Sequence, residues 1–273
     1  MRVESLGLAT DLALIATRGS VVDRGAYLVT ATPDDPGYYH GNMLVLPAPL
    51  EPGELSWALA LFAREVGADP AIRHVTLCWD GVHGEVGATA ELTAAGFSID
   101  TTLVMSATEV AAAPPPPGIE LRPLAPDELA RATELAFAIG GAPGAAYRQF
   151  LQRRTAWHRD LVVRQAATFW GAFADRTLVA SLGVVRLGRL GRYQDVQTAP
   201  GHRRQGIAAA LLAAAGAEAL SAGVEQLAIH TLAGSEALRV YERIGFRTLE
   251  RTASACREPP PPTVSEEASR SRS

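Results

Sequence analysis

The sequence of 273 residues contains no lysine, so all 25 of its basic residues are arginines. Catalysis through a lysine Schiff base is therefore excluded. Any phosphate group has to be bound by arginine side chains or by backbone amides. The same bias, together with abundant alanine, fits a GC-rich bacterial genome and does not by itself indicate a function.

Cysteines and long apolar runs are also scarce. Cys78 and Cys256 stand in separate halves, without partners at metal-ligand spacing, so we expect no metal site and a reducing, cytoplasmic location. No apolar run approaches the ~18 residues of a membrane span. Glu4 and Asp11 interrupt the start of the chain, which argues against a signal peptide. A net charge of −4 disfavours nucleic-acid binding.

A run of prolines divides the chain near its middle. Residues 111–118 read AAAPPPPG, a composition that favours an extended linker. The length favours one to two domains, so we predict one domain over residues 1–110 and another over 119–256. Residues 257–273 are rich in Pro, Ser, Glu and Arg and predict a disordered tail.

The most informative segment is QTAPGHRRQGIA, residues 197–208. A strand-like approach ends at a Pro-Gly break, two arginines follow, and an alanine-rich helical run begins near Ala209. Such a junction predicts an anion site, because free N–H groups, the positive end of the helix dipole and arginine side chains meet there. The spacing matches neither an ATP-type P-loop nor Gly-x-Gly-x-x-Gly.

Two motifs together resemble the GNAT acyltransferase superfamily. Arg203-x-x-Gly206-x-Ala208 is similar to its pyrophosphate loop, Gln/Arg-x-x-Gly-x-Gly/Ala. Residues 235–246, SEALRVYERIGF, are similar to its late helix, Ala-x-x-x-Tyr-x-x-x-Gly-Phe. The alternative is an ordinary solvated helix start and a simple helix stop, but the two motifs jointly favour an acyl-CoA site.

The second half also has the order of elements that this resemblance implies. Strands are predicted over 119–123, 168–173, 177–186, 192–198, 226–230 and 247–254, and helices over 126–138, 145–158, 209–220 and 236–243. A loop is predicted over 140–144, and a turn at 175–176 closes a hairpin. The implied fold class is α/β (α+β), with two tandem GNAT-like domains that each have a mixed central sheet flanked by helices.

The first half repeats this pattern less clearly. Strands are predicted over 41–46, 74–79 and 101–105, and a helix over 53–66. The Gly96-Phe97 turn precedes its partner at Gly245-Phe246 by about 150 residues, a domain-sized period. Residues 46–53, LPAPLEPG, stand where a phosphate loop would lie, yet they contain no arginine, three prolines and an acid. We therefore predict a first copy that does not bind cofactor; the alternative is an unrelated α/β domain.

The resemblance implies acetyl-CoA as co-substrate. Backbone groups of Val196, Gln197 and Thr198 would bind the pantetheine arm. The pyrophosphate would be held by Arg203, Arg204, Gln205, Gly206, Ile207 and Ala208. Glycine at position 206 is expected because a β-carbon would keep the backbone away from phosphate oxygens. Gly234 departs from the family, which often has asparagine there; Ser235 could supply the missing hydrogen bond.

The implied chemistry is direct attack of an amine on the acetyl carbonyl. Tyr241 stands at the family's usual acid position, and a phenol with a pKa of ~10 can protonate the leaving thiolate. Its alternative role is that of a half-buried aromatic on an amphipathic helix. Asp195 is the first choice of base, acting through water. His230 is the second choice, and Glu236 is equally a helix-dipole partner.

The predicted function is that of an acetyl-CoA-dependent N-acetyltransferase, which moves an acetyl group to a primary amine of a small molecule or peptide. The alternative is a non-catalytic acyl-CoA-binding sensor or interaction protein. No metal, nucleic acid or membrane partner is expected, and a homodimer is left open.

Overall fold

The computed structural model describes residues 1–141 and 144–259. The first half contains α1 (Leu6–Ala16), β1 (Ser20–Asp23), β2 (Leu28–Ala31), a short 3₁₀ turn η1 (Tyr39–Gly41), β3 (Leu44–Leu46), α2 (Leu55–Glu65), β4 (Val75–Trp79), α3 (Thr89–Ala94) and β5 (Ser98–Ala107). The second half contains β6 (Ile119–Pro123), α4 (Leu129–Ile139), α5 (Ala145–Val163), β7 (Ala167–Ala174), β8 (Thr177–Leu187), β9 (Leu190–Thr198), η2 (Pro200–His202), α6 (Ile207–Ser221), β10 (Gln226–Leu232), α7 (Ala237–Arg243) and β11 (Arg247–Arg257).

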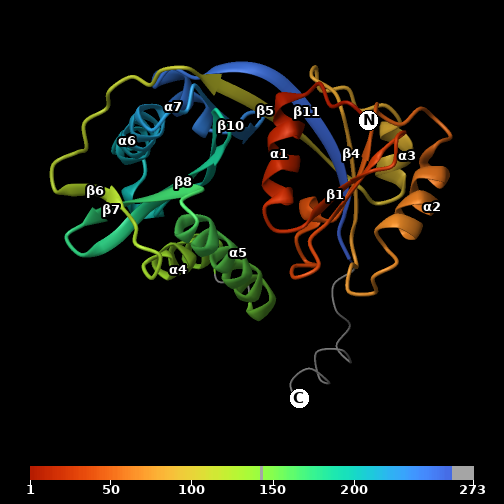
Figure 1. The fold of residues 1–273 in the computed structure, drawn as a ribbon, viewed down its shortest axis with the longest axis horizontal. Helices are drawn as coiled ribbons and strands as arrows, with labels where there is room; N and C mark the ends of the chain where they lie inside the picture. Colours follow the sequence, from red (N-terminus) through yellow and green to blue (C-terminus); the bar gives the residue numbers. More distant parts are fainter. Residues whose placement is uncertain (142–143, 260–273) are drawn as a thin grey trace, which may run out of the picture.

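All of these strands join one sheet of 11 strands in the order β1-β2-β3-β4-β11-β5-β10-β9-β8-β7-β6. Each half has one parallel pair, β3 with β4 and β9 with β10. Beside each pair lies the last strand of the other half, because β11 pairs with β4 and β5 pairs with β10. The two halves therefore exchange their final strands across the middle of the sheet, where β5 and β11 run side by side (Figure 1).

The order of elements repeats between the halves. In each, one helix connects the parallel strands (α2 or α6), and a short helix ending at a Gly-Phe pair (α3 or α7) leads into the exchanged strand. The mixed α/β class with helices flanking a mixed sheet is thus confirmed. The domain boundaries stay a prediction, and the sheet runs continuously across them.

Helices cover the sheet of the second half on both sides. α6 and α7 enclose a cluster that includes Leu211, Tyr193 and Phe246, whereas α4 and α5 enclose one that includes Leu129, Leu161 and Phe169. Figure 1 shows these helix pairs on opposite sides of β7 and β8. In the first half, α2 and α3 cover one cluster and α1 another.

The position of α1 is fixed by a carboxylate from the far end of the chain. Glu250 on β11, which is buried, accepts hydrogen bonds from the Ser5 hydroxyl (2.8 Å) and from the backbone N–H groups of Leu6 (2.8 Å) and Gly7 (3.1 Å). These N–H groups belong to the first turn of a helix and have no partner within it. A negative charge at this end also complements the helix dipole. The exchanged strand thereby places α1 against the second half.

Replacement of Glu250 by alanine should therefore destabilise the whole molecule. Three donors lose a charged acceptor in a buried place, so we expect the free energy of unfolding to fall by about 2–4 kcal/mol. Urea denaturation measures it. Glu120→Ala serves as the control, because the Glu120 side chain is 67% exposed. Equal stability of both variants would contradict this role of Glu250.

Several predictions about local structure hold, and several do not. The hairpin of β7 and β8 closes as expected, with Asp175 at φ 54° in its turn. The predicted strand over 41–46 is wrong for its first residues, because η1 takes up Tyr39–Gly41 and β3 begins only at Leu44. α1, β1 and β2 were not predicted. Arg257 belongs to β11, and residues 260–273 of the predicted tail, like 142–143 of the predicted loop, lie outside the described residues.

Candidate active site

The parallel strands β9 and β10 separate at the centre of the second half. Their ladder joins only residues 226–228 to 190–192. Beyond it, Asp195 has φ 51° and the register against β8 shifts between Ser181 and Gly183, which is the geometry of a bulge. Bulges bend a strand and interrupt its pairing. The main-chain groups of β9 that face β10 beyond the ladder are therefore available to a ligand.

A cavity of about 240 Å³ lies at this separation. It is lined by Arg192, Tyr193, Gln194, Asp195, Val196, Ile229, His230 and Tyr241. The structure thus brings together three of the residues proposed from the sequence, namely Asp195, Val196 and Tyr241, along with the alternative base His230. Exposed Glu236 begins α7 and does not line this cavity.

The predicted phosphate loop connects β9 to α6. Arg204 (φ 60°) and Gly206 (φ 84°) both adopt left-handed backbone conformations, and Gly206 is the residue directly before the helix. The first N–H groups of α6, those of Ile207, Ala208 and Ala209, have no partners within the helix. Alternating backbone turns of this kind gather N–H groups into a concave anion site.

The backbone conformation gives a further reason for glycine at position 206, and the predicted close approach of phosphate oxygens stays a prediction. A β-carbon built on Gly206 would meet nothing within 4 Å, so no protein atom crowds the position. Its φ of 84° is a conformation that costs other residues about 1 kcal/mol or more.

The side chains of the loop divide into exposed and engaged groups. Arg203 and Arg204 are exposed, and the Arg203 Nε donates to the Thr198 carbonyl at 3.2 Å. The side chain of Gln205 bonds to the Gly201 carbonyl (3.1 Å). Gln197 donates to Ser181 (2.8 Å) and to a carbonyl of α4, so its backbone is the part available to a ligand.

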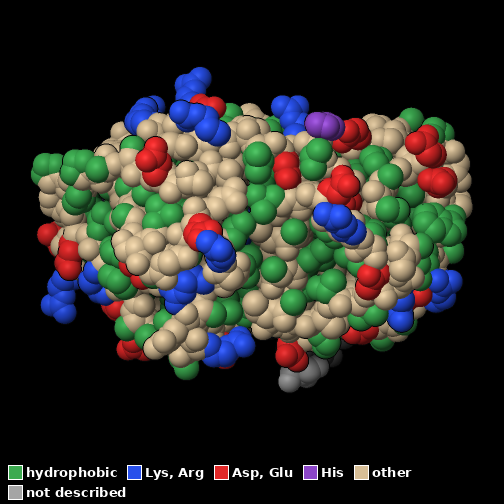
Figure 2. All heavy atoms as spheres, turned by 45° about the horizontal axis from the view of Figure 1, so that its top comes forward, with side chains coloured by type: hydrophobic (Ala, Val, Ile, Leu, Met, Phe, Trp, Pro, Cys, Tyr) green, Lys and Arg blue, Asp and Glu red, His purple; other side chains and the backbone are tan. Residues whose placement is uncertain are grey.

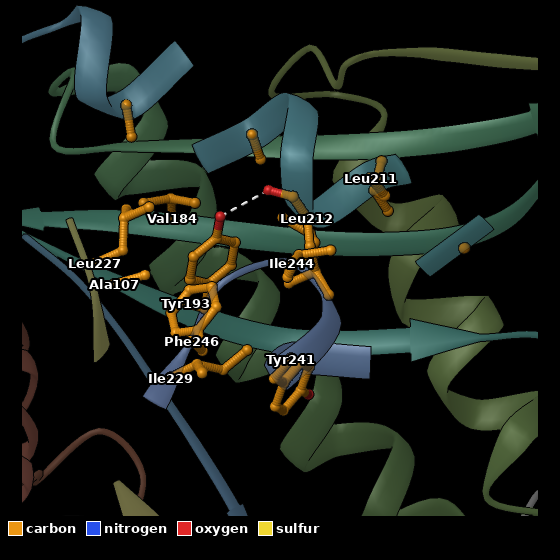
Figure 3. Close-up of a cluster of buried hydrophobic side chains, with 14 of the residues drawn as sticks. Ala107, Val184, Tyr193, Leu211, Leu212, Leu227, Ile229, Tyr241, Ile244 and Phe246 are labelled. Carbon is orange, nitrogen blue, oxygen red and sulfur yellow. Dashed lines mark hydrogen bonds between the residues drawn. The ribbon is translucent and has the colours of Figure 1, made fainter. Parts of the chain in front are cut away.

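Tyr241 on α7 belongs to the cluster shown in Figure 3, in which the Tyr193 hydroxyl donates to the Leu212 carbonyl at 2.7 Å. The Tyr241 side chain is 5% exposed, and its ring centroid lies 6.4 Å from that of Phe246. Burial raises the pKa of Tyr241 to about 12, while the Arg192 guanidinium opposes the rise. The phenol is therefore protonated at neutral pH, as a proton donor has to be.

Asp195 is held from the side of α5. Its carboxylate lies 3.0 Å from the Arg154 guanidinium and 3.7 Å from Nε2 of His158. It borders the main cavity and also a smaller space of about 20 Å³ under α4 and α5, which Arg154, His158 and Gln197 line as well. Its role as a base stays a prediction.

His230 on β10 faces the first half. Its Nδ1 lies 3.7 Å from the Asp11 carboxylate of α1, and the same carboxylate is 3.2 Å from Nη2 of Arg192. Burial lowers the pKa of His230 to about 4, although Asp11 acts in the opposite direction. Arg192, Asp11 and His158 were not proposed as site residues from the sequence.

Burial lowers the pKa of three histidines, His74, His158 and His230, and this makes the stability depend on pH. Burial lowers the pKa of His158, like that of His230, to about 4, whereas both have ordinary values of ~6.5 when unfolded. Below pH ~6.5 the unfolded chain binds protons that the folded chain does not, so stability falls as the pH drops toward 4. We expect a loss of about 2–3 kcal/mol for each of His158 and His230 across this range.

Urea midpoints at pH 7 and pH 4.5 measure this dependence. The His158→Asn variant should lose less stability between these two pH values than the wild type does. His83→Asn is the control, because His83 is exposed between β4 and α3. An identical pH dependence of the wild type and His158→Asn would show that His158 does not contribute.

The corresponding junction of the first half is filled by its own carboxylates. The Gly53 N–H, just before α2, donates to Glu91 of α3 at 2.7 Å, and the Glu51 N–H donates to Glu54 at 2.9 Å. The segment predicted to lack phosphate binding therefore presents acidic groups where α6 presents arginines and free N–H groups. A pyrophosphate placed there would meet two negative charges.

Comparisons with known proteins agree with this geometry. Residues 130–255 match the family model of the acetyltransferase (GNAT) domain. This match lies in the second half of the chain, which therefore carries a GNAT domain. Among proteins with curated descriptions, no sequence matches the chain.

Solved structures match over most of the chain. A GCN5-related N-acetyltransferase from Kribbella flavida is 18% identical, with 96% of this chain and 98% of that one covered and a TM-score of 0.66. A functionally unknown conserved protein from Staphylococcus epidermidis is 9% identical (89% and 95% covered, TM-score 0.69). A tandem GNAT protein from the clavulanic acid biosynthesis pathway is 16% identical (81% and 76% covered, TM-score 0.52). At these identities the likeness concerns the fold.

Proposed function

We propose that the chain is an acetyl-CoA-dependent N-acetyltransferase that acts on a primary amine of a small molecule or peptide. One observation carries the proposal: the cavity between the separated strands, with Tyr241 at its wall, is joined through β9 to the anion site before α6. Acetyl-CoA has a thioester at one end and a diphosphate toward the other, and these two parts suit the cavity and the loop respectively. Its phosphates would bind at residues 203–208, and its pantetheine arm would follow the backbone of Val196–Thr198.

In this reaction the acceptor nitrogen attacks the thioester carbonyl carbon, and a C–N bond forms. The tetrahedral intermediate then collapses as the C–S bond breaks, and the sulfur takes the proton of Tyr241. The phenolate regains a proton that the acceptor nitrogen releases, through water and with Asp195 or His230 as the proposed relay. The net products are the amide and free CoA thiol. The chain's own contribution is to orient the thioester and to supply and recover one proton.

The first half has another part in this proposal. Its acidic junction at Gly53 and Glu91 supports one cofactor site per chain, so a titration of acetyl-CoA should give a stoichiometry of one. On the face shown in Figure 2, acidic and basic side chains are interspersed, which supports a small acceptor over a nucleic acid. No helix of the described residues is long and apolar enough to cross a membrane.

Calorimetry with acetyl-CoA, followed by thiol release with a broad panel of amines, tests the function. Binding together with thiol release by at least one amine, and an acetylated product by mass spectrometry, would support the transferase. Binding with no release above background for any amine would favour the acyl-CoA sensor. Absence of binding would overturn both functions.

A further inference from the structure

The first half of the chain reaches the cavity through α1. Thr10 and Asp11 both contact Arg192, whose side chain lines the cavity together with Tyr241. Nε of Arg192 donates to the Thr10 hydroxyl (3.2 Å), Nη2 donates to Asp11 (3.2 Å), and Nη1 donates to the Tyr193 carbonyl (2.8 Å). The guanidinium is thus fixed on three sides, two of them by a helix more than 170 residues away in the sequence.

A buried guanidinium needs such partners. The Arg192 side chain is 8% exposed, whereas that of Asp11 is 44% exposed. Burial lowers the pKa of Arg192, and the charges of Asp11, Tyr38 and Tyr241 act against this change. Without a nearby carboxylate, burial of the positive charge would cost several kcal/mol. The ion pair with Asp11 therefore explains why a charged arginine can be buried in the cavity wall.

We propose that Asp11 of the first half and Arg192 of the second form an ion pair that sets the acidity of Tyr241, and this inference rests on the proposed function. When Tyr241 gives its proton to the leaving sulfur, its oxygen becomes negative inside a cavity wall. The fixed positive charge of Arg192 stabilises that phenolate, because charges interact strongly where little water screens them. Asp11 offsets part of the effect. Both act as positioning residues through Tyr241.

Other charged and titratable groups surround the same space. They are Asp195 on β9, His230 on β10 and Tyr38 beside η1. Asp195 is paired with Arg154, and burial lowers the pKa of His230 so that it is neutral near pH 7. Arg192 lines the same cavity as Tyr241 and therefore supplies the positive charge at that part of the wall.

A titration of the phenol itself tests the proposal. Residue 241 is replaced by a difluorotyrosine, whose phenol ionises nearer neutral pH, and its ¹⁹F NMR signal is followed against pH in the full chain without any thioester. Arg192→Gln removes the positive charge and should raise the phenol pKa by about one pH unit. Asp11→Asn keeps an oxygen that can accept from Arg192 but removes the negative charge, and should lower the phenol pKa.

These opposite shifts distinguish charge coupling from a general disturbance of the fold, which would not change sign between the two variants. Arg192→Lys retains the positive charge, so the phenol pKa in this variant should stay near the wild-type value. If Arg192→Gln does not fold, Arg192→Lys is measured in its place. A phenol pKa in Arg192→Lys that rises toward the value expected for Arg192→Gln would then count against the proposal. Arg189→Met, with a side chain 78% exposed just before β9, should leave the titration unchanged.

An unchanged pKa in Arg192→Gln would overturn the coupling. An unchanged or raised phenol pKa in Asp11→Asn would show that the first half takes no part in the coupling. Because no thioester is present, either failure is distinct from a failure of acetyl-CoA binding or turnover.

Discussion

Tyr241→Phe is expected to lower turnover by about 10²–10⁴-fold, the usual contribution of a general acid. Without the hydroxyl, no proton donor at this position meets the sulfur, which has to leave as an unprotonated thiolate. The aromatic ring remains, so packing against Phe246 is preserved. Acetyl-CoA affinity should stay within about twofold, because the ring and not the hydroxyl provides the packing. Steady-state thiol release and calorimetry measure the two quantities.

Tyr27→Phe is the matched control for this variant. The Tyr27 hydroxyl donates to Glu65 in the first half, at 3.0 Å, and does not line the cavity. We expect normal turnover in that variant. Normal turnover in Tyr241→Phe as well, or a large loss of acetyl-CoA affinity in it, would assign Tyr241 to packing or binding instead of proton transfer.

The double variant Arg203→Glu, Arg204→Glu should weaken acetyl-CoA binding by well over tenfold. Two exposed guanidinium groups that can each make charge-assisted bonds to a diphosphate become carboxylates that repel it. The backbone N–H groups of the first turn of α6 remain in this variant, but two carboxylates now stand beside them. The fold should be unaffected, since neither side chain is buried.

Arg2→Glu with Arg73→Glu makes the same change in net charge at exposed positions of the first half. This pair should bind acetyl-CoA like the wild type, and its comparison separates local contacts from overall repulsion. Equal weakening in both double variants would indicate a long-range effect that falls with added salt. Unweakened binding in Arg203→Glu, Arg204→Glu would place the phosphates elsewhere.

Sequence patterns predicted the second half well because its signals are local. The Pro-Gly break, the arginine pair and the alanine run specify a strand, a loop and a helix within a single segment, and the structure has β9, η2 and α6 there. The same holds for the helix that bears Tyr241 and ends before Gly245, which adopts φ 112°. The roles assigned to these residues stay predictions.

The first half was predicted less completely because its elements are short. β1 and β2 have four residues each and β3 has three, too few to show a period. α1 is apolar on most of its surface and has no acidic residue in its first turn. Ser5 caps this helix by accepting from the Leu8 N–H at 3.1 Å, a local signal that the sequence analysis did not use. The charged partner of the same helix end, Glu250, stands more than 240 residues further along the chain, where no local pattern could indicate it.

The sequence by itself determined the strand, loop and helix start around residues 197–208, because they depend on neighbouring residues: glycine, arginine and a helix start within ten positions. The anion site at this loop stays a prediction. The sequence also determined that arginine alone could supply positive charge. Only the tertiary structure decided that the halves exchange strands and that α1 brings Asp11 to Arg192. Such contacts join residues far apart in the chain, and they depend on how the sheet pairs and which charges become buried together, which no spacing along the sequence records.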